Sequence, residues 1–319
     1  MTKALLSLLL TLAFASNAGA QTYPSKPIKV VVGFAAGGPA DVLARIIGQR
    51  MATILGQNLV VENRPGAGGT IGARSVAGAE PDGYTLLFGN TSTLVIGPLM
   101  NRNLDYDALK SFAPIASVGT SSNLLVVNPA FPAASVQELV AHAKANPGKL
   151  NYSSPGIGTP PHLIGEMFRQ RAGIEITHVP YRGGGQAAGD VVSGQVQLTF
   201  ENPAVALPLA QAGRIRALAV TSETRNPQAP DIPTMSESGF PGFISVSFTG
   251  MVAPAGTPAE IVSKLNAAVN DSLAAPDVQA TLTKLAVEPR PGSPQEFAAF
   301  LAREREKWGA MIKAAGVAP

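Results

Sequence analysis

A glycine-rich turn at residues 152–162 has the composition of an anion-binding site. The start of a helix leaves its first amide donors unpaired and carries partial positive charge, so short residues in front of it can seat a carboxylate or a phosphate. The alternative is that the hydroxyl groups only cap the helix. His162 opens that helix and either donates to an anion or acts as a cap. The candidate residues of this turn are Ser153, Ser154, Gly156, Gly158, Thr159 and His162.

A second turn of the same design follows the apolar run at residues 28–34 and leads into a segment with helical spacing. Its candidate residues are Phe34, Ala36, Gly37, Gly38 and Asp41. Further candidates follow other apolar runs, namely Asn90, Thr91, Ser92, Tyr181, Arg182, Glu201 and Asn202. Backbone amides in such turns bind a carboxylate without a buried lysine, but they offer no general base. This combination favours a binding protein over an enzyme.

The elements that position these turns are short apolar runs alternating with helical segments. This alternation predicts an α/β fold with mainly parallel sheets, whose ligands lie beyond the carboxyl ends of the strands. Residues 112–127 contain no clear helix and are expected to cross between two lobes as an extended hinge. We predict one lobe from residues 21–120 plus 224–319 and a second lobe from residues 121–223.

Composition and chain ends narrow the class of protein. The 319 residues are 45% hydrophobic and 14% charged, which is ample for two packed cores. Residues 1–20 have the positive start, apolar run and small-residue end of a cleavable signal peptide, which predicts export to the periplasm. The net charge is only +3 and there are no basic runs, so no nucleic-acid partner is expected.

Several kinds of chemistry lack their usual sequence signals. Cysteine is absent, and the three histidines form no spaced metal-binding pair, so neither a metal nor a cofactor is expected. The chain also has no nucleophile elbow and no phosphate-binding loop of the Walker type. His178 is expected to have a packing role.

Six motifs in order resemble one known family. They are GGPAD at 37–41, ENRPGAGG at 62–69, PDGY at 81–84, VPYRG at 179–183, GRIRALAVTS at 213–222 and APAGTP at 253–258. Together they resemble the substrate-binding proteins of tripartite tricarboxylate transporters, also called the Bug family of periplasmic receptors. The resemblance implies a two-lobed periplasmic-binding fold of type II that closes on a small organic carboxylate and delivers it to membrane transporter subunits. It also implies that the turn at 153–159 holds the near carboxylate while residues 34–38 form a lid.

The resemblance leaves the ligand open among dicarboxylates, tricarboxylates, aromatic acids and acidic amino acids, with a monomeric receptor expected. Leu94 and Glu201 depart from the pattern of the family and bear on the far part of the pocket. Leu94 would make that wall more apolar, and Glu201 either pairs with an ammonium group or lies at the surface. Two other functions are weighed. One is a sensor that presents its closed form to a membrane kinase, and the other is a secreted hydrolase that uses Ser153 or Ser154 with His162.

Overall fold

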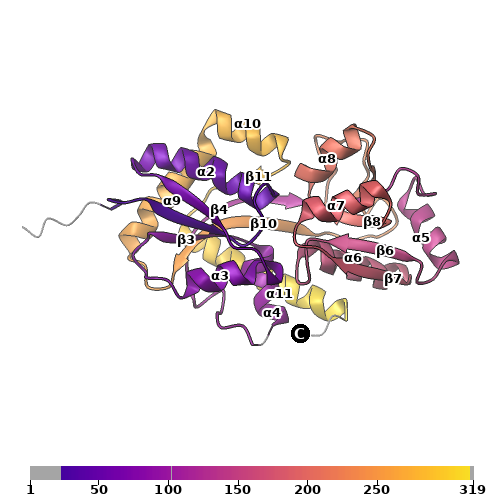
Figure 1. Ribbon diagram of the computed structural model, residues 1–319, viewed down its shortest axis with the longest axis horizontal. Helices are drawn as coiled ribbons and strands as arrows, with labels where there is room; N and C mark the ends of the chain where they lie inside the picture. The colour runs from indigo at the N-terminus through magenta and orange to yellow at the C-terminus, as the bar shows by residue number, and fades with distance from the viewer. Residues whose placement is uncertain (1–22, 102, 317–319) are drawn as a thin grey trace, which may run out of the picture.

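The computed structural model describes residues 23–101 and 103–316, so the predicted signal peptide lies outside the described residues. The chain forms two sheets that lie in two lobes side by side (Figure 1). The strands of the first sheet are β1 (Ile28–Val32), β2 (Leu59–Asn63), β3 (Thr85–Asn90), β4 (Phe112–Ser122), β10 (Val246–Pro254) and β11 (Glu288–Pro289). Those of the second are β5 (Leu124–Val127), β6 (Leu150–Ser154), β7 (Ile176–Pro180), β8 (Leu198–Glu201) and β9 (Arg216–Val220).

Both sheets are mixed. The first has the order β11-β4-β10-β3-β1-β2, with β1 parallel to β2 and β3 and with β10 antiparallel to β3 and β4. The second has the order β7-β6-β8-β5-β9, with β6 parallel to β7 and β8 and with β5 antiparallel to β8 and β9. The two-lobed α/β class is confirmed, but the antiparallel pairs depart from the mainly parallel sheets predicted. They arise because β5 and β10 enter their sheets directly from the other lobe rather than through a crossover helix.

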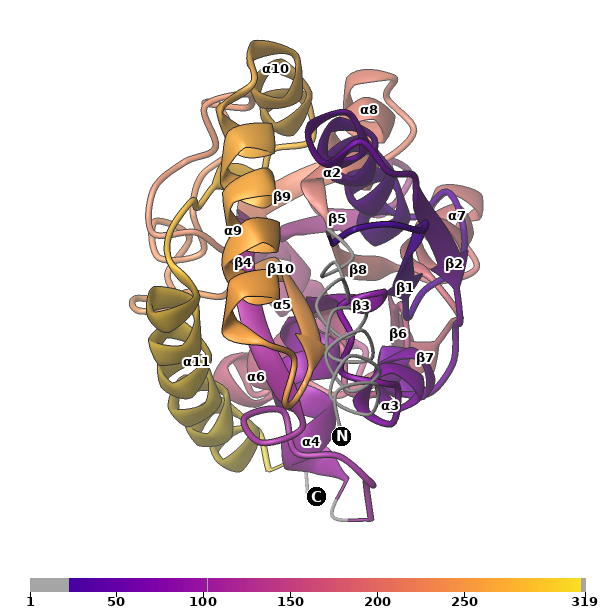
Figure 2. The same ribbon diagram turned by 90° about the vertical axis from the view of Figure 1, so that its left-hand side faces the viewer.

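Helices cover both faces of each sheet (Figures 1 and 2). They are α2 (Pro39–Leu55), α3 (Thr70–Ala77), α4 (Gly97–Met100), α5 (Val136–Ala145), α6 (Pro160–Ala172), α7 (Gly184–Ser193), α8 (Pro203–Gln211), α9 (Ala259–Ala274), α10 (Pro276–Lys284) and α11 (Pro294–Ala314). A short 3₁₀ turn, η1 (Ala67–Gly69), precedes α3, and a π-helical turn, η2 (Ser92–Ile96), precedes α4.

The continuous apolar run of β1 is explained by burial on both faces. Val30 and Val32 pack in one core with α2, α9 and α10, whereas Val31 packs in the other with α3 and α11. Strands between two helical layers have this composition because both of their faces are removed from water. The second sheet is covered in the same way, by α5 and α6 on one face and by α7 and α8 on the other.

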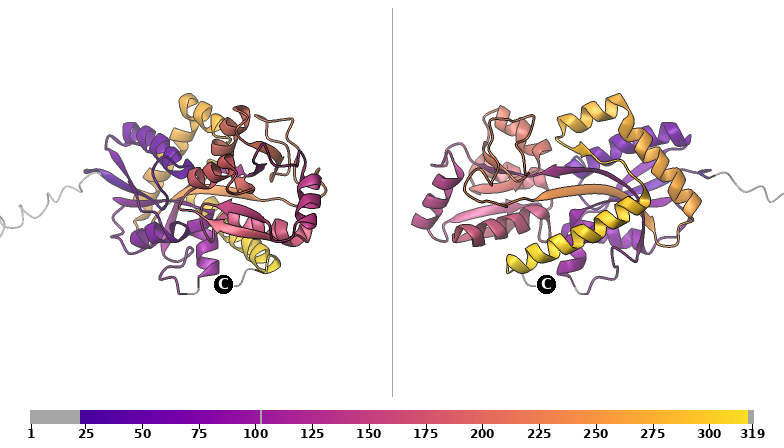
Figure 3. Two further views of the ribbon diagram at one scale, coloured as in Figure 1. Left: turned by 45° about the vertical axis from the view of Figure 1, so that its right-hand side comes forward. Right: turned by 180° about the vertical axis from the view of Figure 1, so that it is seen from behind.

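The chain crosses between the lobes twice, and one side chain joins the two crossings. The first crossing runs from β4 into β5 through Asn123, and the second enters β10 after Ser245. The hydroxyl of Thr221 accepts from the amide of Asn123 at 2.9 Å and donates to the carbonyl of Ser245 at 2.6 Å. Figure 3 shows β4 and β10 running together between the lobes, with α11 alongside them. The extended hinge expected at residues 112–127 is formed by β4 and β5.

The second lobe extends further along the chain than the sequence indicated. Residues 224–245, which were assigned to the first lobe, pack on the second sheet through Met235 and Phe243. These side chains are buried with Phe168 and Phe200 of that lobe. Because the loop is rich in proline and lacks periodicity, its few apolar anchors gave no sign of which sheet they join.

Candidate ligand-binding site

A cleft of about 490 Å³ lies between the lobes, and both lobes line it. Eleven of the residues proposed from the sequence line this cleft. They are Phe34, Ala36, Gly37, Gly38, Asn90, Thr91, Ser92, Thr159, Arg182, Glu201 and Asn202. The seven others, Asp41, Ser153, Ser154, Gly156, Gly158, His162 and Tyr181, are not among the lining residues.

Five helical segments begin at the cleft. Their N-terminal capping residues are Gly38 for α2, Thr91 for η2, Thr159 for α6, Gly183 for α7 and Asn202 for α8. The start of a helix carries partial positive charge, so the cleft favours a bound anion. Some of the first amides are already bonded, because that of Ala204 in α8 donates to Asn202 and that of Thr93 in η2 donates to Asn90. Proline at the first position of α2, α6 and α8 removes an amide donor from each of these helix starts. The first turn of α7 contains no proline and keeps its amide donors.

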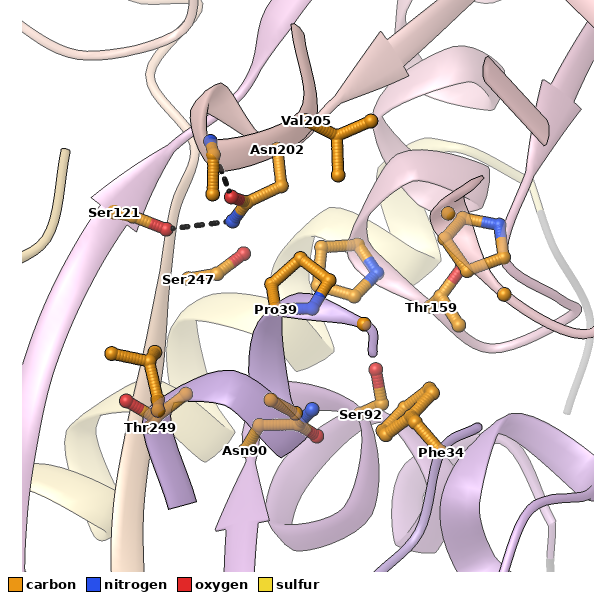
Figure 4. Close-up of a pocket in the computed structure, with 18 of the residues that line it drawn as sticks. Phe34, Pro39, Asn90, Ser92, Ser121, Thr159, Asn202, Val205, Ser247 and Thr249 are labelled. Atoms are coloured by element: carbon orange, nitrogen blue, oxygen red, sulfur yellow. Dashed lines mark hydrogen bonds between the residues drawn. The ribbon is translucent and has the colours of Figure 1, made fainter. Parts of the chain in front are cut away.

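Two polar side chains after β3 offer donors to the cleft. Asn90 accepts at Oδ1 from the amide of Thr93 at 3.1 Å, and this bond directs its Nδ2 group away from that turn. Ser92 lies beside Asn90, and both face the cleft together with Phe34 (Figure 4). Thr91 instead anchors the neighbouring strand, because its hydroxyl accepts from the amide of Phe248 at 2.8 Å. We call Asn90 and Ser92 the donor end of the cleft.

The turn at 153–159 bonds mainly to itself. The amide of Gly156 donates to the hydroxyl of Ser154 at 3.1 Å, and the hydroxyl of Thr159 donates to the carbonyl of Gly156 at 2.6 Å. The amide of Gly158 is directed to Nδ1 of His162 at 3.4 Å, and the hydroxyl of Ser153 donates to the carbonyl of Ala187 at 3.0 Å. The turn is therefore a preformed platform that presents Thr159.

A histidine pair, His162 buried and His178 half-buried, supports this platform. Nε2 of His178 lies 2.7 Å from the hydroxyl of Ser154, and its ring lies 4.3 Å from that of His162 and 4.9 Å from that of Tyr152. Burial, followed by the neighbouring His162, lowers the pKa of His178 to about 4. Burial also lowers the pKa of His162. The pairing of Ser154 with His162, weighed in the hydrolase alternative, is not found, because His178 lies against the hydroxyl of Ser154. Besides packing, His178 therefore holds this turn.

Asp41 and Tyr181 also act behind the cleft wall. Asp41 accepts from the amide of Gly37 at 2.9 Å, from Nδ2 of Asn63 at 2.9 Å and from Arg45. Burial opposes the ionisation of Asp41, but these bonds hold its pKa below the usual range. The hydroxyl of Tyr181 donates to Asp190 at 2.5 Å. Asp41 thereby holds the loop that contains Gly37, and Tyr181 holds the one that contains Arg182. Both loops line the cleft.

Glu201 is a buried wall of the cleft and not the surface residue that the sequence left as one alternative. Its side chain is 1% exposed, and its Oε1 accepts from the amide of Asn202 at 2.8 Å. Burial raises the pKa of Glu201 to about 7, against the lowering effect of that bond. Among the lining residues, all of which belong to the described part of the chain, Glu201 is the one carboxylate and Arg182 the one cation.

Leu94 does not form the apolar far wall that was expected. It is 2% exposed and packs in the core of the first lobe beside Val95 and Ile96. Its side chain also closes over Gly89, where an added Cβ would lie 2.6 Å from its Cδ1. The lining residues that the sequence did not reveal come from the crossing strands and from the start of α7. They include Gly119, Thr120, Ser121, Asn123, Gly184, Gly185, Gln186, Ser247 and Thr249.

A known family model matches most of the chain. Residues 43–317 match the tripartite tricarboxylate transporter family receptor. The chain belongs to this receptor family. Protein BugT of Bordetella pertussis is 34% identical to this receptor over 307 residues, which cover 96% of this chain and 94% of BugT.

Solved structures agree with this assignment. An R. palustris protein with adipate is 37% identical to the receptor, with a TM-score of 0.90 over 93% of this chain and 99% of that chain. MatC from Rhodopseudomonas palustris, with bound malate, is 35% identical with a TM-score of 0.87 over 91% of this chain and 100% of that chain. Within residues 23–101 and 103–316 of the receptor, no helix is long and apolar enough to span a membrane, and no group of acidic or histidine side chains could hold a metal ion.

Proposed function

We propose that this receptor binds one small organic carboxylate in the cleft between its lobes, in the periplasm, and delivers it to membrane transporter subunits. The observation that carries the proposal is the convergence of five helix starts on one cleft that both lobes line. The adipate and malate bound by two structural neighbours support a carboxylate as the ligand class.

The carboxylate is assigned to the donor end. Nδ2 of Asn90 and the hydroxyl of Ser92 donate to it from the first lobe, and Thr159, whose own hydroxyl donates to Gly156, lines the cleft from the second. Residues Phe34 to Gly38 close over it as a lid. Fixed neutral donors suit this task, because they bind an anion without the desolvation cost of burying a lysine.

Closure of the lobes is the proposed mechanism. A ligand held by one lobe gains contacts with the other only when the cleft closes, so binding shifts the equilibrium toward the closed form. The lobes approach each other closely at Gly68, where an added Cβ would lie 2.8 Å from the carbonyl oxygen of Ile157. The paired crossings through Asn123 and Ser245 provide the hinge.

We propose further that the receptor is a monomer and has no enzymatic activity. Ser154, which lies against His178, is fully buried, and neither residue is among those that line the cleft. A nucleophile in this position has no access to a substrate in the cleft. The sequence hypothesis of a hydrolase therefore gains no support from this pair.

Titration calorimetry against a panel of short mono-, di- and tricarboxylates tests the binding role. We expect one-to-one saturable binding of at least one acid, and we expect Ser92→Ala to weaken it about tenfold by removing a donor to a charged group. The matched control Ser193→Ala changes an exposed serine of α7 outside the cleft and leaves the affinity unchanged. Absence of binding by every acid would contradict the proposal.

The delivery role has its own test. Deletion of the gene is expected to abolish uptake of the bound acid by cells that carry the transporter. Normal uptake with loss of ligand-induced gene expression would instead support a sensor that acts on a membrane kinase.

A further inference from the structure

The cleft has a second end where hydrogen-bond acceptors lie without protein donors. Oε2 of Glu201 and Oδ1 of Asn123 are both buried, and neither atom has a hydrogen-bond partner among the described residues. Both residues line the cleft. We call this pair of atoms the acceptor end. Buried polar atoms are nearly always hydrogen-bonded, so these two acceptors and the hydroxyl of Thr249, a third such atom among the lining residues, indicate a missing partner.

The two acceptors come from neighbouring strands. Leu124, which follows Asn123, pairs with Glu201 across β5 and β8. Nδ2 of Asn123 donates to the carbonyl of Phe200 at 3.3 Å, and the amide of Asn123 donates to Thr221. These bonds fix the side-chain amide, so its oxygen remains available only as an acceptor.

Glu201 receives no ion pair from the protein. Among residues 23–101 and 103–316, no lysine, arginine or histidine lies within ion-pair distance of its carboxylate, although Arg182 lines the same cleft. A buried carboxylate with one amide donor is costly unless another donor completes its shell. Because Glu201 lines the cleft, a donor group on a bound molecule is positioned to complete that shell.

The start of α7 favours the charged form of this carboxylate. A Cβ added at Gly184 would lie 2.8 Å from Oε1 and 3.3 Å from Oε2, so both oxygens lie against the first turn of the helix. The partial positive charge of that turn stabilises a nearby anion. Glycine at this position leaves the carboxyl group its space.

We propose that the ligand carries a hydrogen-bond donor, a hydroxyl or an ammonium group, remote from its carboxylate, and that Glu201 and Asn123 accept from it. The inference rests on the proposed function and narrows it from carboxylates in general to hydroxy acids and amino acids. Ser121 and Asn202, whose side chains bond each other at 3.2 Å, border this region (Figure 4). Glu201 is thus the residue that determines specificity at the acceptor end.

Calorimetry with matched acids tests this proposal. The four-carbon series is butyrate, succinate, 4-hydroxybutyrate and 4-aminobutyrate, and the six-carbon series is hexanoate, adipate, 6-hydroxyhexanoate and 6-aminohexanoate. In the series that fits the cleft, we expect a donor-bearing acid to bind about tenfold more tightly than the unsubstituted acid and the diacid. The relative affinities of the hydroxy and amino acids show whether the receptor prefers a hydroxyl or an ammonium donor.

Glu201→Gln is expected to reduce the preference for an amino acid about tenfold and the preference for a hydroxy acid less, with the fold checked by circular dichroism. Glu175→Gln, which changes an exposed glutamate outside the cleft, is the matched control and leaves both preferences unchanged. Tighter binding of the diacid, strengthening below pH 7, would mean that a protonated Glu201 donates to a second carboxylate, and would overturn the proposal. Binding of no acid would instead refute the proposed function itself.

Discussion

One end of the cleft offers hydrogen-bond donors to a ligand, and the other end offers acceptors. At the donor end, Asn90 and Ser92 present donors from the first lobe. At the acceptor end, Glu201 and Asn123 present oxygens with no donor among the described residues. The two ends also differ in position, because Asn90 ends β3 and Ser92 follows it within one lobe, whereas Asn123 lies in the hinge itself.

This contrast indicates how a nearly neutral cleft can orient a small ligand. A molecule with an acidic end and a donor end fits in one direction only, since reversal would place its carboxylate against Glu201. Two carboxylates in contact in a buried site repel each other strongly when both are ionised. In the proposed mechanism, a ligand that bonds Asn123 contacts the hinge directly, which would couple its binding to closure of the lobes.

The largest expected effect concerns the charge at the acceptor end. Burial raises the pKa of Glu201 to about 7 in the folded state from its ordinary value of 4.5, so the folded protein binds more protons than the unfolded chain between these values. Stability therefore falls as pH rises from about 4.5 to about 7, by an amount on the order of 3 kcal/mol.

Comparison with Glu201→Gln isolates this contribution. His178, whose pKa is lowered to about 4, acts in the opposite direction but is common to both proteins. Chemical denaturation of the ligand-free proteins at several pH values should show the wild type losing stability relative to the variant up to about pH 7. A difference that does not change with pH would show that Glu201 is not buried as described.

A smaller effect is expected from crowding the acceptor end. Gly184→Ala places a methyl group 2.8 Å from Oε1 of Glu201 and displaces the carboxyl group. Because the displaced atoms end a side chain, the fold is kept, while affinity for the best acid of the panel falls about tenfold. Gly189→Ala, on the same helix with no atom near the added Cβ, should bind as the wild type does. Equal affinities of both variants would show that space at position 184 is not needed for ligand binding.

The smallest effect is expected behind the donor end. His178→Phe keeps the stacked ring but loses the bond to Ser154, which should lower the free energy of unfolding by about 1 kcal/mol. Since the platform at 153–159 keeps its own bonds, ligand preference should not change. His142→Phe, on a half-buried position of α5, serves as the stability control. A changed ligand preference in His178→Phe would show that the turn is not self-supporting.

Much of the fold could be predicted because local signals agreed with burial. The strand at β1 has an apolar run with two buried faces, and α5 begins after Ser135, whose hydroxyl accepts from the amide of Glu138. Helices α7 and α8 were not predicted, because glycine opens one and Pro208 lies inside the other. Tertiary packing outweighed their weak propensity.

The sequence predicted which turns line the cleft, but not which of their polar groups are free to bond a ligand. Turns after strands indicated where Phe34, Ser92 and Thr159 lie, since ligands bind beyond the strand ends. Composition could not show that the amides of the 153–159 turn bond within it. Nor could it show that Glu201 is buried without a cation, because that depends on which strands flank it.

A crystal structure of the receptor with the best acid of the matched series would show the orientation of the ligand. We expect one ligand in the cleft, with its carboxylate at Asn90 and Ser92 and its hydroxyl or ammonium group within hydrogen-bond distance of Glu201. A ligand bound in the reverse direction, or a carboxylate seated against Glu201, would contradict this expectation.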